Sequence, residues 1–172
     1  MASVSIYDVI IPTFTKGLKT LDHILTKAEQ FAKEKGLDVN TAFFDARIVE
    51  DQNPLVFQIQ NATKTVKVTL SRLGIASQAF VDKEKTFADL HSRIQEALNL
   101  LQSVDPAVVN ARADEEIDLP FGGKVLKVSG RAAALNQGIP NFFFHLNAGY
   151  AILRAKGVPV GKADYISSFL GL

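Results

Sequence analysis

The chain has 172 residues, of which 47% are hydrophobic, 19 are lysine or arginine and 18 are aspartate or glutamate. This length and apolar content fit a single globular domain over residues 1–172 and exclude wholesale disorder. A net charge of +1 argues against nucleic acid as the main partner, since phosphate binding needs a concentrated basic surface. Because the sequence has no cysteine, disulfides, thiolate nucleophiles and cysteine-based metal sites are excluded.

The N-terminal segment lacks the features of a targeting or anchoring sequence. It has no basic region like that of a signal peptide, and Asp8 and Pro12 interrupt the apolar residues that follow Ser5. No apolar stretch approaches the roughly 20 residues that a membrane span needs. We therefore expect a cytoplasmic protein with no membrane partner.

Helical periodicity predicts two long amphipathic helices in the first half of the chain. Ser5 is a suitable N-cap for the first, which ends at Gly36, while Pro54 and Gly74 bound the second. The apolar positions recur every three or four residues, at Phe14, Leu18, Leu21, Leu25, Ala28 and Ala32 and then at Leu55, Ile59, Ala62, Val66, Leu70 and Leu73. Asp38 or Asn40 would cap a short helix between the two.

A third helix and a hairpin follow a connection over residues 75–85. Thr86 opens a capping sequence, and Pro106 closes the segment. The inward positions are Phe87, Leu90, Ile94, Leu98 and Leu101. Two β-prone runs, 117–119 and 125–128, then flank the turn Gly122-Gly123, which predicts a short β-hairpin.

The fourth predicted helix covers roughly residues 130–156, with a break or kink at Gly138-Ile139-Pro140. Asn141 and His145 fall on one face of it, four residues apart. The remaining faces are apolar, which is typical of a central helix or of one that also forms a subunit interface. We expect the apolar tail, 166–172, to dock back on the helices.

Several sequence runs resemble one protein family over about residues 6–165. The runs are Arg47-Ile48-Val49-Glu50-Asp51-Gln52-Asn53-Pro54-Leu55-Val56-Phe57-Gln58, Pro140-Asn141-Phe142-Phe143-Phe144-His145, Tyr150-Ala151-Ile152-Leu153-Arg154 and Gly161-Lys162-Ala163-Asp164-Tyr165. The family is of unknown function, occurs in bacteria and fungi, and is placed with the DinB/YfiT-like proteins. The resemblance implies an all-α, up-and-down four-helix bundle with a small β-hairpin between the third and fourth helices.

Many DinB-like proteins are similar in binding a divalent metal through three histidines, one from the second helix and two from the fourth. By this resemblance His145 matches the later histidine of the fourth helix, and Asn141 occupies the earlier position. Gln58 is the nearest inward candidate of the second helix. Because neutral amides are poor ligands for zinc or nickel, we expect no tightly bound metal and no other cofactor.

The leading hypothesis is a small-molecule site between the second and fourth helices. Gln58, Asn141 and His145 would converge inside the bundle, and Arg47 and Asp51 would close its mouth. His145 would carry a proton, the two amides would orient a carbonyl or hydroxyl, and Arg47 would clamp an anionic group. This set suits ligand binding or metal-independent acid–base catalysis.

Other interpretations of the same residues stay open. His145 could hydrogen-bond Gln58 merely to fix the helix register. A divalent-metal-dependent transferase or hydrolase would need His91 or Asp51 as a substitute ligand beside His145. A non-catalytic scaffold would use the phenylalanines at 142–144 as contact surface. We expect a homodimer that forms through the fourth helix or the first.

Overall fold

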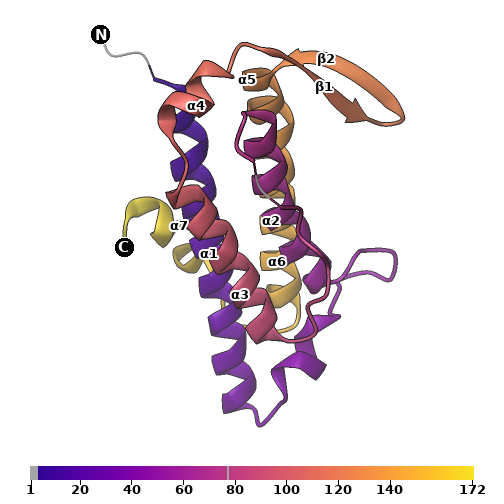
Figure 1. The fold of residues 1–172 in the computed structure, drawn as a ribbon. Helices are drawn as coiled ribbons and strands as arrows, with labels where there is room; N and C mark the ends of the chain where they lie inside the picture. The colour runs from indigo at the N-terminus through magenta and orange to yellow at the C-terminus, as the bar shows by residue number, and fades with distance from the viewer. Residues whose placement is uncertain (1–3, 77) are drawn as a thin grey trace.

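The computed structural model describes residues 4–76 and 78–172 of the chain. They form a mainly helical fold with one two-stranded antiparallel hairpin (Figure 1). The α-helices are α1 (Ile6–Glu34), α2 (Leu55–Arg72), α3 (Phe87–Gln102), α4 (Pro106–Ala111), α5 (Gly130–Ala133), α6 (Ile139–Ala155) and α7 (Lys162–Leu170). Two π-helical segments, η1 (Asn40–Phe44) and η2 (Ala134–Gly138), and the strands β1 (Glu116–Phe121) and β2 (Lys124–Ser129) complete the fold.

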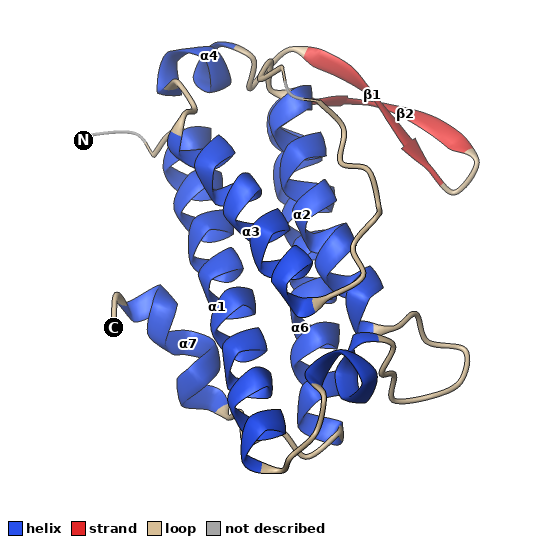
Figure 2. Cartoon of the chain, turned by 60° about the horizontal axis from the view of Figure 1, so that its bottom comes forward, coloured by secondary structure: helices blue, strands red, loops and turns tan. Residues whose placement is uncertain are grey.

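The four longest helices, α1, α2, α3 and α6, lie side by side and enclose the hydrophobic core (Figure 2). Every residue of the three predicted apolar stripes is buried, as the periodicity predicts. α2 packs on α6 along one flank and on α3 along the other. α7 packs across α1.

Local signals in the sequence fix where these helices begin and end. Ser5 and Thr86 each form a capping box with the aspartate three residues later, so α1 and α3 start where the pattern predicts. Gly74, just after α2, has φ of +88°, a conformation that favours glycine. Pro12 lies inside α1, near its start.

Two helices go beyond the prediction. Pro106 is predicted to close the third helix, but α3 ends at Gln102 and Pro106 opens α4, where Asp105 caps the Ala107 amide. The tail docks back as expected, but as a helix, α7, whose first turn is closed by an Asp164 hydrogen bond to the Gly161 amide.

The predicted fourth helix is one continuous helical segment, but its hydrogen-bonding pattern changes from α to π and back to α. It begins as α5, passes through the π-helical segment η2 and continues as α6. The interruption lies at the predicted Gly138-Ile139-Pro140 break, where a wider turn accommodates the proline at the start of α6. The short helix predicted after Asp38 is present as the π-helical segment η1.

The predicted hairpin is confirmed, with Leu119 paired opposite Leu126. Gly122 and Gly123 both have positive φ, as a tight two-residue turn requires. The hairpin projects from the α4–α5 end of the molecule, and its base contacts α5 (Figure 1).

Of the helices described, none combines the length and apolarity needed to cross a lipid bilayer.

Candidate functional site

The contact between α2 and the α6 region is lined by polar side chains from both partners. Three hydrogen-bonded pairs follow it in antiparallel register: Gln58 with His145, Thr65 with Asn141, and Arg72 with Gln137 of η2. Polar pairs in an otherwise apolar interface hold one helix register, because a slip would leave buried groups without partners.

The Gln58–His145 pair is the chemically informative one. His145 Nδ1 lies 2.9 Å from Gln58 Oε1, and Gln58 Nε2 donates to the Asn53 carbonyl at 2.8 Å. The second bond fixes the orientation of the amide, since only its nitrogen can donate to a carbonyl. Oε1 therefore faces the imidazole as an acceptor, so Nδ1 carries the proton and the neutral ring keeps an unprotonated Nε2.

The surroundings of His145 favour this neutral form. Its side chain is 8% exposed, and burial lowers the pKa of the imidazole below its ordinary value. The rings of Phe57 and Phe144 stand edge-on to it, with centroids 6.0 and 5.3 Å away. Nε2 has no hydrogen-bond partner among the described residues. It is not one of the fully buried polar atoms that lack a partner, so it keeps some contact with solvent.

Asn141 does not join this pair. Its Nδ2 donates to Thr65 Oγ1 at 2.7 Å, and the Thr65 hydroxyl in turn donates to the Asn61 carbonyl at the same distance. The predicted trio is thus divided into two neighbouring polar pairs, with Gln58 serving His145 and Thr65 serving Asn141.

Arg47 and Asp51 lie in the exposed loop that precedes α2. Arg47 Nη1 donates to the Glu50 carbonyl of the same loop at 3.3 Å. The loop reaches the candidate site through Asn53, whose carbonyl holds Gln58.

The residues present do not fit the divalent metal that the DinB resemblance implies. His145 is accompanied by one neutral amide, Gln58. His91 faces α1 instead, where its Nδ1 lies 2.6 Å from Asp22 Oδ1, and Asp51 is exposed in its loop. Within residues 4–76 and 78–172, no group of three or more histidine, cysteine, aspartate or glutamate side chains is arranged to hold a metal ion.

Comparison with known proteins places the chain in a family. The model of a domain of unknown function, DUF1993, matches residues 6–166. The chain belongs to the DUF1993 family. This DUF1993 chain is also similar to a DinB family member protein from Shewanella denitrificans, with 38% sequence identity, a TM-score of 0.82, and coverage of 93% of this chain and 90% of that one. Comparison with the curated proteins gives no match.

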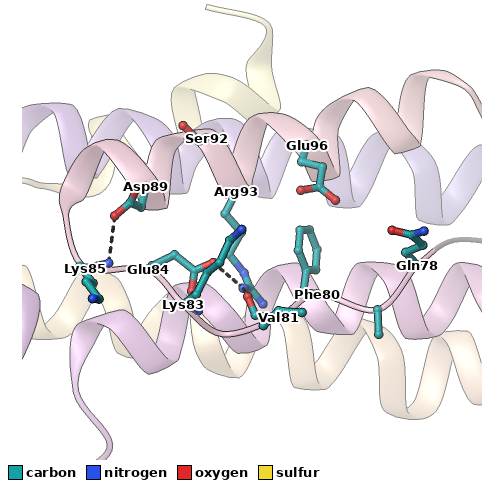
Figure 3. Close-up of a pocket in the computed structure, with 11 residues that line it drawn as sticks. Gln78, Phe80, Val81, Lys83, Glu84, Lys85, Asp89, Ser92, Arg93 and Glu96 are labelled. Carbon is teal, nitrogen blue, oxygen red and sulfur yellow. Dashed lines mark hydrogen bonds and ion pairs between the residues drawn. The ribbon is translucent and has the colours of Figure 1, made fainter.

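Two cavities of this DUF1993 chain lie away from His145. One, of about 560 Å³, is bounded by residues 78–85 and α3 (Figure 3). The other, of about 590 Å³, is a shallow depression beside Asp22 and His91.

A second polar centre, around Arg93 and Lys67, is absent from the sequence-based predictions. Both side chains are buried, with relative exposures of 3% and 7%. The sequence signal was weak, since Arg93 directly precedes the inward Ile94, and a charged residue at such a position usually reaches solvent with its long stem.

Proposed function

We propose that this chain binds a small polar molecule beside His145, at the outer edge of the α2–α6 contact, without a metal. The observation that carries the proposal is the Asn53–Gln58–His145 relay, which holds the imidazole in one tautomer. An unprotonated Nε2 accepts a hydrogen bond, so the ligand would offer an O–H or N–H group there. The same atom would act as a general base if the bound molecule reacts.

The other predicted residues have supporting roles in this proposal. Gln58 orients the imidazole and does not itself need to touch the ligand. Asn141 lies on α6 one turn before His145 and donates to Thr65 of α2, so it supports the helix contact beside the site. Arg47 and Asp51 contribute as parts of the loop whose Asn53 carbonyl fixes Gln58, and they would contact a ligand from its rim.

The similarity to a DinB family member supports a further part of the proposal. In this proposal the four helices of an up-and-down DinB-type bundle correspond to α1, α2, α3 and α6. The helices α4, α5 and α7 are additions to that bundle. The proposed site then lies on the pair of helices that carries the metal ligands in the resemblance, with an amide–imidazole pair in their place.

Ligand-detected NMR with a panel of uncharged hydroxyl and amide fragments tests the proposal. His145→Ala should keep the fold and lose the fragments that bind the wild type. Asn141→Ala is the matched control, because it removes a polar side chain from the same helix one turn away, and it should keep them. If His145→Ala unfolds the protein and no fragment binds the wild type, the pair serves only the helix register.

A second candidate function, a homodimeric scaffold, is favoured by large apolar side chains exposed on α6 and α2. Phe144 is 67% exposed on α6, and Val68 is 45% exposed on α2. Large apolar side chains at the surface are favoured at protein interfaces. Sedimentation equilibrium should give a dimer for the wild type and a monomer for Phe144→Ser; a monomeric wild type would overturn this candidate.

A further inference from the structure

Residues 78–85, here called the strap, run along the groove between α2 and α3 as an extended segment (Figure 3). Among the described residues, no backbone–backbone hydrogen bond joins the strap to another element. The strap is held almost entirely by side chains of the two helices, which is how an extended peptide ligand is held by a groove.

Alternate strap residues face the groove, as in a β-strand. The Gln78 carbonyl accepts from Lys67 Nζ at 3.0 Å, and the Phe80 ring lies under two cations, with Lys67 Nζ at 3.5 Å and Arg93 Cζ at 4.2 Å from its centroid. The intervening Val81 side chain is 70% exposed.

Two carboxylates continue the alternation. Asp82 forms ion pairs with Lys64 and with Arg93, the latter at 3.0 Å. Glu84 accepts from Arg93 Nη1 at 2.7 Å and from the Gln60 amide at 2.8 Å. Burial alone would raise the pKa of the Glu84 carboxyl, but these hydrogen bonds outweigh it and lower the pKa, so Glu84 is bound as an anion.

The groove carries charges of both signs, and Glu96 of α3 pairs with Lys67 at 2.7 Å. Its cations that meet the strap are Lys64 and Lys67 of α2 and Arg93 of α3. Two groups of α2 hold Arg93 in place. Thr63 Oγ1 accepts a hydrogen bond from Arg93 Nε at 2.8 Å, and the Gln60 carbonyl accepts one from Arg93 Nη2. Its guanidinium is therefore oriented by the helices before it meets the strap.

The strap does not fill its groove. A cavity of about 560 Å³ remains between the strap and α3, lined on the helix side by Asp89, Ser92, Arg93 and Glu96. Cavities of this size accommodate small ligands or several side chains. A bulkier segment than the strap would therefore fit against the same residues of α3.

We propose that the α2–α3 groove is a binding site for an extended protein segment of a partner, and that the strap, in which Lys83 and Lys85 balance Asp82 and Glu84, occupies it in cis. The segment would carry an aromatic residue followed at the second and fourth positions by carboxylates, as Phe80, Asp82 and Glu84 do. Release of the strap would break no backbone–backbone hydrogen bond among the described residues, and water or a partner's carboxylates would take over the contacts of Lys64, Lys67 and Arg93. The strap thus competes with a partner from a tethered position.

A peptide of residues 78–85, acetylated and amidated at its ends, is the probe. It is titrated into the full-length, ¹⁵N-labelled wild type and into Phe80→Ala/Asp82→Asn, in which self-occupancy is weakened while Glu84 still pairs with Arg93. Chemical-shift changes are followed at the amides of residues 60–67 and 89–96. The control peptide carries alanine, asparagine and glutamine in place of phenylalanine, aspartate and glutamate.

The proposal predicts that the variant binds the peptide about tenfold more tightly than the wild type does, because a tethered competitor has been removed. The control peptide should produce no saturable change. Adding Lys67→Met to the variant should weaken peptide binding about tenfold, since one charged contact and one cation–π contact are lost. Should the double variant not fold, Phe80→Ala alone is titrated in the same way. A folded variant that binds neither peptide, or binds both equally, overturns the proposal.

Discussion

Helix α2 carries two polar clusters, one against α6 and one against α3, and they differ in charge. Toward α6 the pairs Gln58–His145 and Thr65–Asn141 are neutral. Toward α3 the contact is ionic and centred on Arg93. Neutral hydrogen bonds are insensitive to salt. Ion pairs in contact with solvent, such as Lys64–Asp82, weaken as ionic strength rises, and the nearly buried Arg93–Glu84 pair weakens much less. The first cluster is suited to hold fixed geometry, and in the second the Lys64–Asp82 pair is the contact that salt loosens first.

Two threonines of α2 serve one cluster each. Thr63 accepts from Arg93, and Thr65 accepts from Asn141. Both hydroxyls donate to the carbonyl four residues earlier, Ile59 and Asn61 respectively, which leaves their lone pairs for the incoming donor. Two of the β-branched residues that lower the helix propensity of α2 thus orient its polar partners.

The largest expected effect comes from breaking the ionic cluster. Arg93→Met removes a side chain that pairs with Asp82 and Glu84 and donates to Thr63, and the Arg93 and Glu84 side chains are both nearly buried. Breaking a buried ion pair from one side costs about 3 kcal/mol of unfolding free energy. Urea unfolding measures the loss, with Arg112→Gln, which removes an exposed pair, as the control. Equal stability of the two variants would show that the cluster contributes nothing.

The α2–α6 side is best perturbed at Gly138. An added Cβ would lie 2.6 Å from Thr69 Oγ1 and 3.2 Å from its methyl group. Gly138→Ala should therefore destabilise the protein by about 2 kcal/mol through overpacking. Thr69→Ala removes both contacting atoms, so the double variant should recover much of the loss in a double-mutant cycle. If the destabilisations of the two single variants simply add, residues 138 and 69 do not contact each other as described.

The two clusters also differ from the pH-sensitive contact of α1 with α3. A hydrogen bond to Asp22 raises the pKa of His91 against the opposing effect of burial, and Glu29, 3.3 Å from Nε2, adds to the rise. Stability from this contact is complete below the ordinary histidine pKa of about 6.5 and is lost as pH rises through the higher folded value. His91→Gln should flatten the pH dependence of thermal unfolding in that window; an unchanged slope would exclude the ion pair.

His145 should show the opposite sign. Burial lowers its pKa, so its contribution to stability is complete above about pH 6.5 and is lost as pH falls through the lower folded value. His145→Gln should remove this loss while leaving stability at pH 8 less affected. If the variant keeps the acid-side loss, another group causes it.

Most of the helical framework could be predicted because it rests on local rules. Apolar spacing predicts the buried stripes of α1, α2 and α3, and capping boxes predict the starts of α1 and α3. The short helix α4 was missed although Asp105 and Pro106 are a typical start signal, because Pro106 was interpreted as the end of α3. α7 has no buried residue, so its apolar pattern gave no helical face to detect.

The candidate site could be predicted only in part. Spacing within α6 indicates that Asn141 and His145 share a face, but the choice of partner depends on the register against α2, which no local pattern contains. That register gives Gln58 to His145 and Thr65 to Asn141. Arg93 was missed for a similar reason, since the carboxylates that neutralise it lie in an irregular strap.

The central claim is that His145 is a neutral imidazole with its proton on Nδ1 and a free Nε2. A long-range ¹H–¹⁵N correlation spectrum of the histidine rings at pH 7, assigned with His145→Gln, measures this directly. The account predicts a protonated Nδ1 and an unprotonated Nε2 at His145, and loss of this single-tautomer pattern in Gln58→Leu. A protonated Nε2, or an imidazolium at pH 7, would contradict it.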